Sequence, residues 1–251
     1  MKHLKKNSKR RTVIFDQVID QYSFQEIVHL IYCALNNNQK LLLFALNIHI
    51  LVELRKNKIL KDQIEQNGVI YADGVPLLWL SALLSTPLKG RVSGTDLCDY
   101  ILSHRLPTKK KIKVFFISGN ETIFLLAQKK YPNTIVGGYV PPFFSSWNDE
   151  LLKNIRTLIL SSQANVILIG LGPLKQEEWL CQEFKDIPQL LVGMGVGSAI
   201  EILTGQKKRA PQFLQALGAE WLWRIGLEPR RLLRRYLRDG IEILSLFLRF
   251  R

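Results

Sequence analysis

A single carboxylate, Asp73, occupies the position at which this sequence most clearly favours chemistry. It follows a short apolar run at residues 69–71, which predicts a buried strand, and it precedes an apolar segment at residues 75–84, which we expect to be helical. Open α/β sheets build their binding sites at the carboxyl ends of strands. The neighbouring Gly74 permits a sharp turn and the close approach of a ligand. We therefore interpret Asp73 as a site carboxylate; a cap on the following helix is the alternative and the commoner use of an aspartate there.

Polar residues follow two other predicted strands in the same way. Asn47 comes directly after a buried strand predicted at residues 40–46. A loop that opens a helix follows the apolar run at residues 165–170, and it contains three candidate substrate contacts: Gly172, Lys175 and Gln176. Taken singly, Lys175 and Gln176 are better explained as first-turn residues of an exposed helix.

Residues 193–197, Gly-Met-Gly-Val-Gly, form a glycine-rich stretch after a strand predicted at residues 189–192. The stretch suggests a dinucleotide loop, but the third glycine of that fingerprint is missing and the stretch comes late in the fold. A phosphate or sugar-nucleotide loop explains Gly195 and Gly197 equally well. Tight packing of a helix on a strand is also possible.

Residues 91–96, Arg-Val-Ser-Gly-Thr-Asp, precede a helix expected over residues 94–102. Arg91 and Gly94 are the candidate contacts in this segment. We interpret Asp96 either as a helix cap or as an ion-pair partner of Arg91.

The elements that must position these residues alternate between strand and helix. This alternation predicts βαβ units, and so a Rossmann-like α/β fold with a mostly parallel sheet between two layers of helices. The carboxyl ends of the strands then meet at one edge, where helix N-termini suit a phosphorylated ligand. Further expected features are a capping box of Ser23 and Glu26, a strand at 113–118, a helix at about 120–130, a strand at 134–136, a Pro-rich aromatic loop at 137–146 that would suit a flexible flap, and a helix from a Ser146 cap to about 161.

The net charge of +14 is concentrated at the two ends of the chain. Residues 1–11 hold six cations and no acid, and residues 221–251 hold eight arginines and three acids, so that 6 + 5 of the 14 charges lie there. Such ends on a nearly neutral body indicate an anionic partner: lipid, nucleic acid or a phosphate-bearing substrate. We expect residues 1–11 to be a mobile basic tail.

After about residue 212 the pattern becomes purely helical. An apolar stripe beside several arginines predicts a basic amphipathic helix that binds an anionic membrane surface. The alternative is an ordinary terminal helix packed on the domain. The stripe comprises Leu232, Leu233, Tyr236, Leu237, Ile241, Leu244, Phe247 and Leu248.

Several classes of protein are disfavoured. The three cysteines and four histidines show no metal-ligand spacing, so we predict neither a metal site nor a cofactor, and we interpret Cys33, Cys98 and Cys181 as small apolar residues. The sequence has no run of 18 apolar residues free of glycine or charge and no secretory signal, which favours the cytoplasm or the inner face of a membrane.

A series of sequence blocks resembles the WecG/TagA/CpsF glycosyltransferase family, and the resemblance runs from about Lys40 to about Tyr236. The order and spacing of the blocks are specific, although each block alone is not. The blocks are Asn47, ADGV at 72–75, RVSGTD at 91–96, GPLKQE at 172–177, MGVG at 194–197, KRAP at 208–211, LGAEW at 217–221 and EPRR at 228–231.

The resemblance implies an inverting transfer of a sugar from a UDP-sugar to a polyprenyl-diphosphate-linked N-acetylglucosamine. The type donor of the family is UDP-N-acetylmannosamine, and its members build cell-surface polysaccharides. It also implies a metal-independent enzyme, peripheral on the cytoplasmic face of the membrane. An α/β core at 12–211 would carry a helical membrane-associating appendage at 212–251 that closes the site. Self-association in solution is a further expectation.

The resemblance assigns roles to individual residues. Asp73 matches the catalytic base and Gln176 a substrate-contacting glutamine. Asn47 and Arg91 match cleft positions. The appendage arginines that would offset charge on the departing UDP are Arg224, Arg231 and Arg234, and we add Glu201, at the end of the glycine-rich segment, as a substrate contact.

This chain departs from the family where the donor would be bound. It has Ala45 where threonine is frequent, Ser-Ala-Ile-Glu after Gly197, and two prolines at 141–142. Donor identity therefore stays open among N-acetylmannosamine, glucose, another hexosamine and a uronic acid. Competing hypotheses are a nucleic-acid-binding protein, which lacks a recognition motif, a nicotinamide-dependent oxidoreductase, and a non-catalytic sugar-nucleotide-binding partner.

Overall fold

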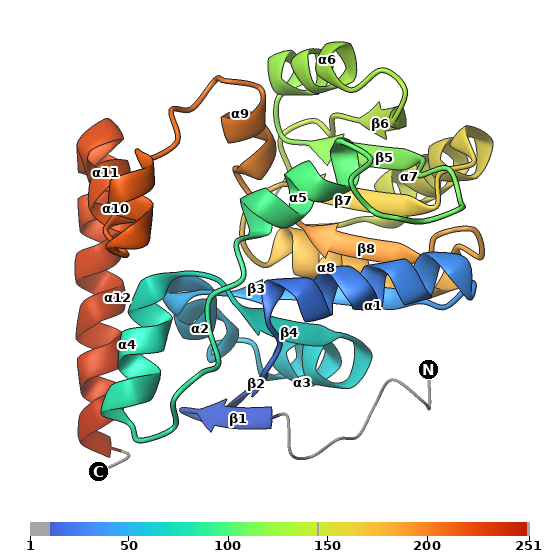
Figure 1. The fold of residues 1–251 in the computed structure, drawn as a ribbon. Coiled ribbons are helices and arrows are strands. Elements are labelled where there is room, and N and C mark those ends of the chain that lie inside the picture. The colour runs from blue at the N-terminus through green and yellow to red at the C-terminus, as the bar shows by residue number, and fades with distance from the viewer. Residues whose placement is uncertain (1–10, 145, 250–251) are drawn as a thin grey trace.

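The computed structural model describes residues 11–144 and 146–249, and its centre is a parallel sheet of six strands (Figure 1). The strand order is β4-β3-β8-β7-β5-β6. Apolar runs such as Leu-Leu-Leu-Phe-Ala-Leu form these strands because both faces of the sheet are buried. The strands are β3 (Leu41–Leu46), β4 (Val69–Ala72), β5 (Val114–Ser118), β6 (Ile135–Tyr139), β7 (Val166–Gly170) and β8 (Val192–Gly195). The predicted α/β class is confirmed.

Helices cover both faces of the sheet, and side chains that alternate along the strands fill two cores. From β3, for example, Leu42 and Phe44 enter one core and Leu43 the other. The first core packs on α2 (Ile48–Leu54), α3 (Lys58–Asn67), α7 (Asp149–Ser162) and α8 (Lys175–Glu183), the last followed by the short 3-10 turn η2 (Phe184–Asp186). The second packs on α1 (Phe24–Asn36), α5 (Gly94–Leu102), α6 (Glu121–Lys130) and α9 (Ala199–Leu203). The capping box of Ser23 and Glu26 starts α1 as predicted.

A hairpin precedes the sheet and was not predicted. Its strands are β1 (Arg11–Ile14) and β2 (Gln17–Asp20), and both residues of the turn, Phe15 and Asp16, have positive φ. Asp20 accepts a hydrogen bond from the Ile70 backbone N–H at 2.8 Å, so the hairpin lies against the edge strand β4. Arg11, expected in a basic tail, instead pairs with Asp20 at 2.9 Å. The rest of that tail, residues 1–10, lies outside the described residues.

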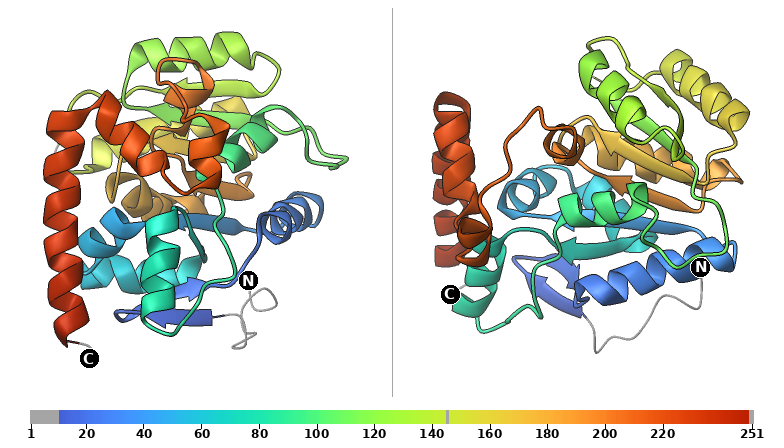
Figure 2. Two further views of the ribbon diagram at one scale, coloured as in Figure 1. Left: turned by 60° about the vertical axis from the view of Figure 1, so that its left-hand side comes forward. Right: turned by 45° about the horizontal axis from the view of Figure 1, so that its top comes forward.

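Three helices complete the chain: α10 (Gln212–Ala216), α11 (Glu220–Leu227) and α12 (Pro229–Arg249). They stand along one side of the molecule beside α2 and α4 (Val75–Leu83), as Figures 1 and 2 show. The purely helical C-terminal segment is therefore confirmed. In the described part of the chain, no helix combines the length and the apolar character needed to cross a membrane.

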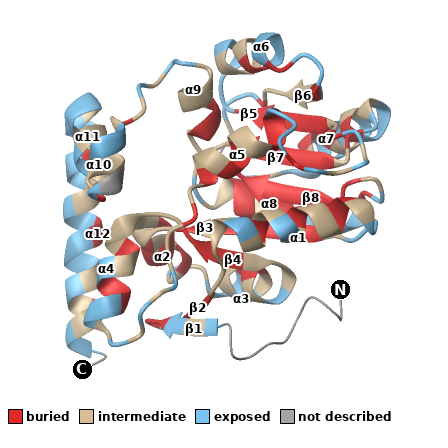
Figure 3. Cartoon of the chain, in the orientation of Figure 1, coloured by how far each residue is buried: buried red, intermediate tan, exposed pale blue. Residues whose placement is uncertain are grey.

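The apolar stripe predicted on α12 is divided between two faces of the helix. Leu232 is buried and Phe247 packs against the core, so the inner face is docked on the domain. The outer face leaves five apolar side chains 48–70% exposed: Leu233, Leu237, Ile241, Leu244 and Leu248. In Figure 3 the ribbon of α12 is accordingly coloured mainly pale blue for exposed residues. Packing of a terminal helix on the domain is therefore confirmed for the inner face, and membrane binding by the outer face stays a prediction.

Three predicted boundaries were wrong. The strand predicted at 134–136 is β6 and continues to Tyr139, so Gly137 and Gly138 lie in the sheet and not in the aromatic loop. Asn148, not Ser146, caps α7, because its side chain accepts from the Leu151 N–H at 2.9 Å. The last strand occupies residues 192–195 rather than 189–192, which places Gly193 and Gly195 inside the sheet.

Candidate active site

The strand order fixes where a crevice forms. From β3 the chain turns to β4 on one side, and all later strands lie on the other side, beginning with β8. A ligand site is expected at the carboxyl ends of the strands that meet at such a switch. Asn47, Asp73 and Gly197 follow β3, β4 and β8, and Gln176 begins the helix after β7. The expected gathering of these residues at one sheet edge is confirmed.

Asn47 is held at the start of α2, where its Oδ1 accepts from the Ile50 N–H at 3.1 Å. This N-cap satisfies an otherwise free backbone donor and fixes the side chain. A Cβ placed on Gly74 would lie 3.9 Å from the Asn47 Cβ, so the turn after β4 runs directly beside Asn47.

Asp73 does not cap the helix that follows it. The N-cap of α4 is Gly74, with a φ of 116° and no side-chain cap, so the commoner interpretation of Asp73 was wrong. Its backbone N–H donates to the Leu46 carbonyl at 2.7 Å, and its carboxylate accepts from the Gly94 N–H at the start of α5. A Cβ on Gly94 would lie 3.4 Å from Asp73 Oδ2, so the glycine allows a close approach.

The environment of Asp73 tunes its protonation. Burial raises the pKa of its carboxyl from 3.8 to about 6; Arg224, Arg91 and the Gly94 N–H act to lower this pKa, and Glu220 acts to raise it. The residue as a whole is half-buried. A carboxylate whose pKa lies near neutrality is suited to act as a general base.

Helix α11 brings a charged cluster to this carboxylate. Glu220 accepts from Arg91 at 3.1 Å and from Arg224 at 2.6 Å, and thereby joins the core to the C-terminal helices. The suggested Arg91–Asp96 pair was wrong: Asp96 binds Arg209 at 2.5 Å. Ser93 is the cap of α5, so Asp96 is not. The sequence analysis gave Glu220 no role, although it lies in the block at 217–221.

Comparison with known protein families matches residues 12–251 to the "Glycosyl transferase WecG/TagA/CpsF family". The chain belongs to this family. Similar proteins include the N-acetylglucosaminyldiphosphoundecaprenol N-acetyl-beta-D-mannosaminyltransferases of Staphylococcus aureus strains NCTC 8325 / PS 47 and MRSA252. Each is 29% identical over 175 residues, which are 68% of this chain and 66% of the relative. The match thus spans just under two thirds of each relative's length.

Within this glycosyltransferase fold, Gln176 is a buried residue of α8 rather than part of an exposed first turn. Its Nε2 donates to Glu177 Oε1 at 2.8 Å, and its Oε1 accepts from the Gly197 N–H at 3.2 Å. A Cβ on Gly195 would lie 2.5 Å from Gln176 Nε2. Gly195 therefore makes room for Gln176, and the glycine run is a closely packed strand. Of its glycines, only Gly197 has a positive φ, 48°, and lies in the turn after the strand.

Lys175 is engaged by the aromatic loop. Its ammonium donates to the Phe144 carbonyl and lies 4.2 Å from the centroid of the Phe144 ring. The Trp147 indole donates to the Lys175 carbonyl at 2.9 Å and packs on Phe144 at 4.6 Å. This loop, predicted as a flap, is thus attached to α8 beside Gln176. Gly172, with a φ of 84°, lies in the turn before that helix.

Two of the remaining predicted contacts, Glu201 and Arg231, lie in an ion-pair chain at the base of α12. Lys207 binds Glu201 at 2.5 Å and Glu228 at 3.2 Å, and Glu228 also accepts from Arg231 at 2.6 Å. Arg234 is exposed. Among the contacts of residues 11–144 and 146–249, none joins Arg231 or Arg234 to Asp73. Arg224, in contrast, binds Glu220 in the charged cluster beside Asp73.

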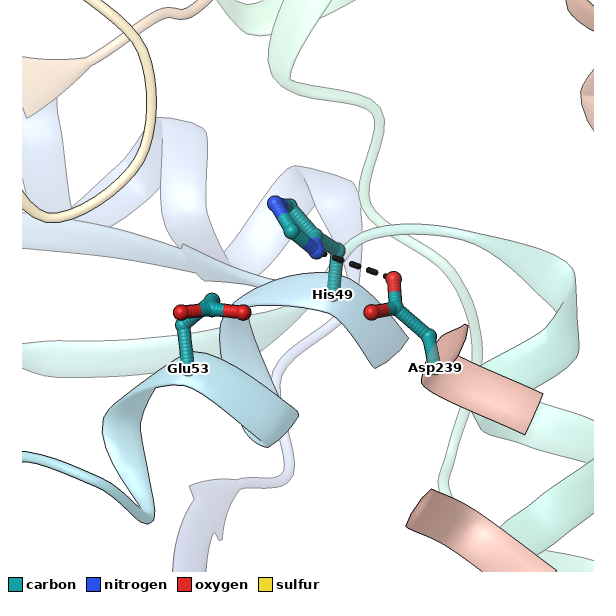
Figure 4. A group of neighbouring side chains, drawn as sticks. All are labelled: His49, Glu53 and Asp239. Carbon is teal, nitrogen blue, oxygen red and sulfur yellow. Dashed lines mark hydrogen bonds and ion pairs between the residues drawn. The ribbon is translucent and has the colours of Figure 1, made fainter. Parts of the chain in front are cut away.

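One group in the described part of the chain has metal-ligand chemistry, although spacing along the sequence did not predict it. His49 and Glu53 from α2 meet Asp239 from α12, with ligand atoms within 4.8 Å of one another (Figure 4). Arg238 donates to Glu53 Oε1 at 2.8 Å and to Asp239 Oδ1 at 3.3 Å. Its guanidinium thus already binds both carboxylates that a cation would use.

Proposed function

We propose that this chain moves a sugar, N-acetylmannosamine or a related hexose or uronic acid, from a UDP-sugar to a polyprenyl-diphosphate-linked N-acetylglucosamine. Family membership supports the class of reaction, and the names of the Staphylococcus aureus relatives support this acceptor and sugar. The observation that carries the proposal is Asp73, a carboxyl with a pKa of about 6 at the switch point of the sheet, beside two arginines.

In this mechanism Asp73 takes the proton from the acceptor hydroxyl as the hydroxyl oxygen attacks the anomeric carbon. The new carbon–oxygen bond forms as the bond to the β-phosphate oxygen breaks, and UDP leaves. Attack from the face opposite UDP inverts the anomeric centre. Arg224 and Arg91 supply fixed positive charge for the developing diphosphate, and Glu220 holds both guanidinium groups in place.

The outer face of α12 supports a second part of the proposal, binding to an anionic membrane surface at the cytoplasmic side, where a lipid-linked acceptor would reside. Its five exposed apolar residues lie at 233, 237, 241, 244 and 248, a helical spacing that forms one strip, and exposed arginines such as Arg230 and Arg234 lie on the same helix. Such a face binds through apolar burial and attraction to acidic headgroups.

Vesicle co-sedimentation tests the membrane proposal. The double substitution Leu237→Ser with Ile241→Ser is expected to release the protein from phosphatidylglycerol vesicles, while phosphatidylcholine vesicles bind neither form. Ile59→Ser, at an exposed apolar position on α3, is the matched control. Equal binding of the double variant and wild type would contradict this use of α12.

UDP release tests the reaction. Purified protein is given a panel of UDP-sugars and a short-chain prenyl-diphosphate N-acetylglucosamine. Acceptor-dependent release from one donor, lost in Asp73→Asn, is the expected result, and it identifies the sugar. Absence of release from folded protein with lipid present would refute the transferase proposal, and release that survives Asp73→Asn would refute the role of Asp73.

A further inference from the structure

The interface between α2 and α12 has a buried carboxylate at its middle. Three residues of α12 are buried, Leu232, Asp239 and Leu246, with exposed fractions of 3%, 1% and 5%. They are spaced by seven residues, so they form one inner stripe in which an acidic residue lies between two leucines. A single polar residue in an apolar helical seam fixes the register of the two helices, because any other register leaves it buried without its partners.

The partners of Asp239 come from both helices. Asp239 Oδ2 accepts from His49 Nδ1 at 2.9 Å, and Asp239 Oδ1 accepts from Arg238 at 3.3 Å. Arg238 also binds Glu53, one turn beyond His49 on α2, so two residues of α2 hold two residues of α12. Burial and the nearby charge of Arg235 lower the pKa of His49, while Asp239 and Glu53 act to raise it. The lowered pKa favours the neutral imidazole at neutral pH, and the contact with the Asp239 carboxylate places its proton on Nδ1.

Both helices of this contact lead directly to the candidate active site. α2 begins immediately after Asn47. Glu228 alone separates α12 from α11, the helix that carries Arg224, and the rings of Trp221 and Tyr236 pack at 6.0 Å across these two helices. A slip of α12 by one turn would move it about 5.4 Å along its axis and would carry Arg224 away from Asp73.

We propose that Asp239 is a positioning residue, which through His49 and Arg238 fixes the register of α12 on α2 and thereby holds Arg224 beside Asp73. The catalytic consequence depends on the proposed transferase function, but the register itself does not. Arg238 fills the position between the carboxylates, so the group acts as an ion-pair and hydrogen-bond clasp rather than as a metal site.

Hydrogen exchange of the α12 backbone amides in the full chain tests the clasp without any activity. Asp239→Ala is expected to exchange at least about tenfold faster over α12, because the His49 N–H and the Arg238 guanidinium lose a buried acceptor. Asp239→Asn keeps an acceptor for His49 and should restore most of the protection. Glu242→Gln removes an exposed negative charge three residues further along the same helix and should match wild type. Unchanged exchange in Asp239→Ala would overturn the proposal.

The pH dependence of turnover separates positioning from loss of fold. If Arg224 moves away, the pKa of Asp73 is no longer lowered by that charge, so the acid limb of the kcat profile should move to higher pH in Asp239→Ala. We expect kcat to fall about tenfold or more with little change in KM, because an interaction with the departing group is lost. A lower kcat with an unmoved acid limb would overturn the link to Asp73. An increase in the melting temperature with Zn²⁺ or Mn²⁺ in wild type but not in Asp239→Ala would overturn the clasp in favour of a metal site.

Discussion

Replacing Asp73 by asparagine should stabilise the protein while it abolishes turnover. The unfolded carboxyl ionises near pH 3.8, but in the fold its pKa is about 6. Between these two values the folded state binds more protons, so stability is lost as the pH rises through this window and the loss is complete above it. A difference of about two pH units corresponds to about 3 kcal/mol at 1.36 kcal/mol per unit.

The increase in the free energy of unfolding of the Asp73→Asn variant should be smaller than this upper limit of about 3 kcal/mol. The amide oxygen that Asp73→Asn introduces can still accept from the Gly94 N–H, and Glu220 remains the partner of Arg91 and Arg224. The amide NH₂ adds a polar group that must itself be desolvated. We therefore expect Asp73→Asn to raise the free energy of unfolding by about 1–3 kcal/mol above about pH 7, or about 2–4 °C in Tm for each kcal/mol in a chain of this size.

Urea or thermal unfolding at several pH values measures this effect. The stability advantage of Asp73→Asn should shrink as the pH falls and disappear below about pH 3, where the carboxyl is protonated in both the folded and the unfolded state. Asp62→Asn, which removes an exposed carboxylate from α3, should show no such trend. A stabilisation that does not depend on pH, or an Asp73→Asn protein less stable than wild type at about pH 7.5, would refute the reasoning.

Three other outcomes are expected. Gly195→Ala should destabilise the protein by about 1–3 kcal/mol and lower turnover, because the added methyl group would lie 2.5 Å from Gln176 Nε2. Arg224→Met should lower kcat at least about tenfold and move its acid limb to higher pH, because a charge that lowers the Asp73 pKa is removed. Removal of residues 221–251 should abolish turnover and leave the α/β core folded. Unfolding curves, pH–rate profiles and circular dichroism, respectively, provide the measurements.

Each of these outcomes has a matched control. Gly90→Ala adds a methyl group with no neighbour within 4 Å and should leave stability unchanged; a wild-type melting curve for Gly195→Ala would contradict the close packing at Gln176. Arg234→Met removes an exposed cation of α12, and a shift of its acid limb equal to that of Arg224→Met would point to general charge rather than position. Full turnover by the truncated chain would show that the C-terminal helices do not complete the site.

Local pattern was sufficient to predict the sheet, its order of strand and helix along the chain, and the edge at which the candidate residues meet. The apolar runs are long, and an Asn or an Asp directly follows β3 and β4, so Asn47 and Asp73 could be placed from sequence alone. The predicted strand boundaries were wrong where glycine residues lie within a strand. Gly193 and Gly195 have turn composition, but Leu42 and Gln176 approach them so closely that an added Cβ would force these side chains to move.

Contacts between distant residues could not be predicted. The hydrogen bond from the Ile70 N–H to Asp20, fifty residues away, joins the hairpin to β4, and the sequence of the hairpin offers only two short β-branched runs. The two faces of α12 have similar composition, and only packing on α2 decides that Leu246 is buried and Ile241 exposed.

The sequence by itself thus determined which residues stand at the ends of strands, because the period of apolar residues reports how each local segment is buried. The tertiary structure alone decided what surrounds them. Glu220 and Arg224 lie near Asp73 although they are about 150 residues further along the chain. Asp239 likewise binds His49, which is 190 residues away in the sequence. The pKa of a carboxyl depends on the burial and charge around it, so the property that suits Asp73 to act as a base exists only once the chain has folded.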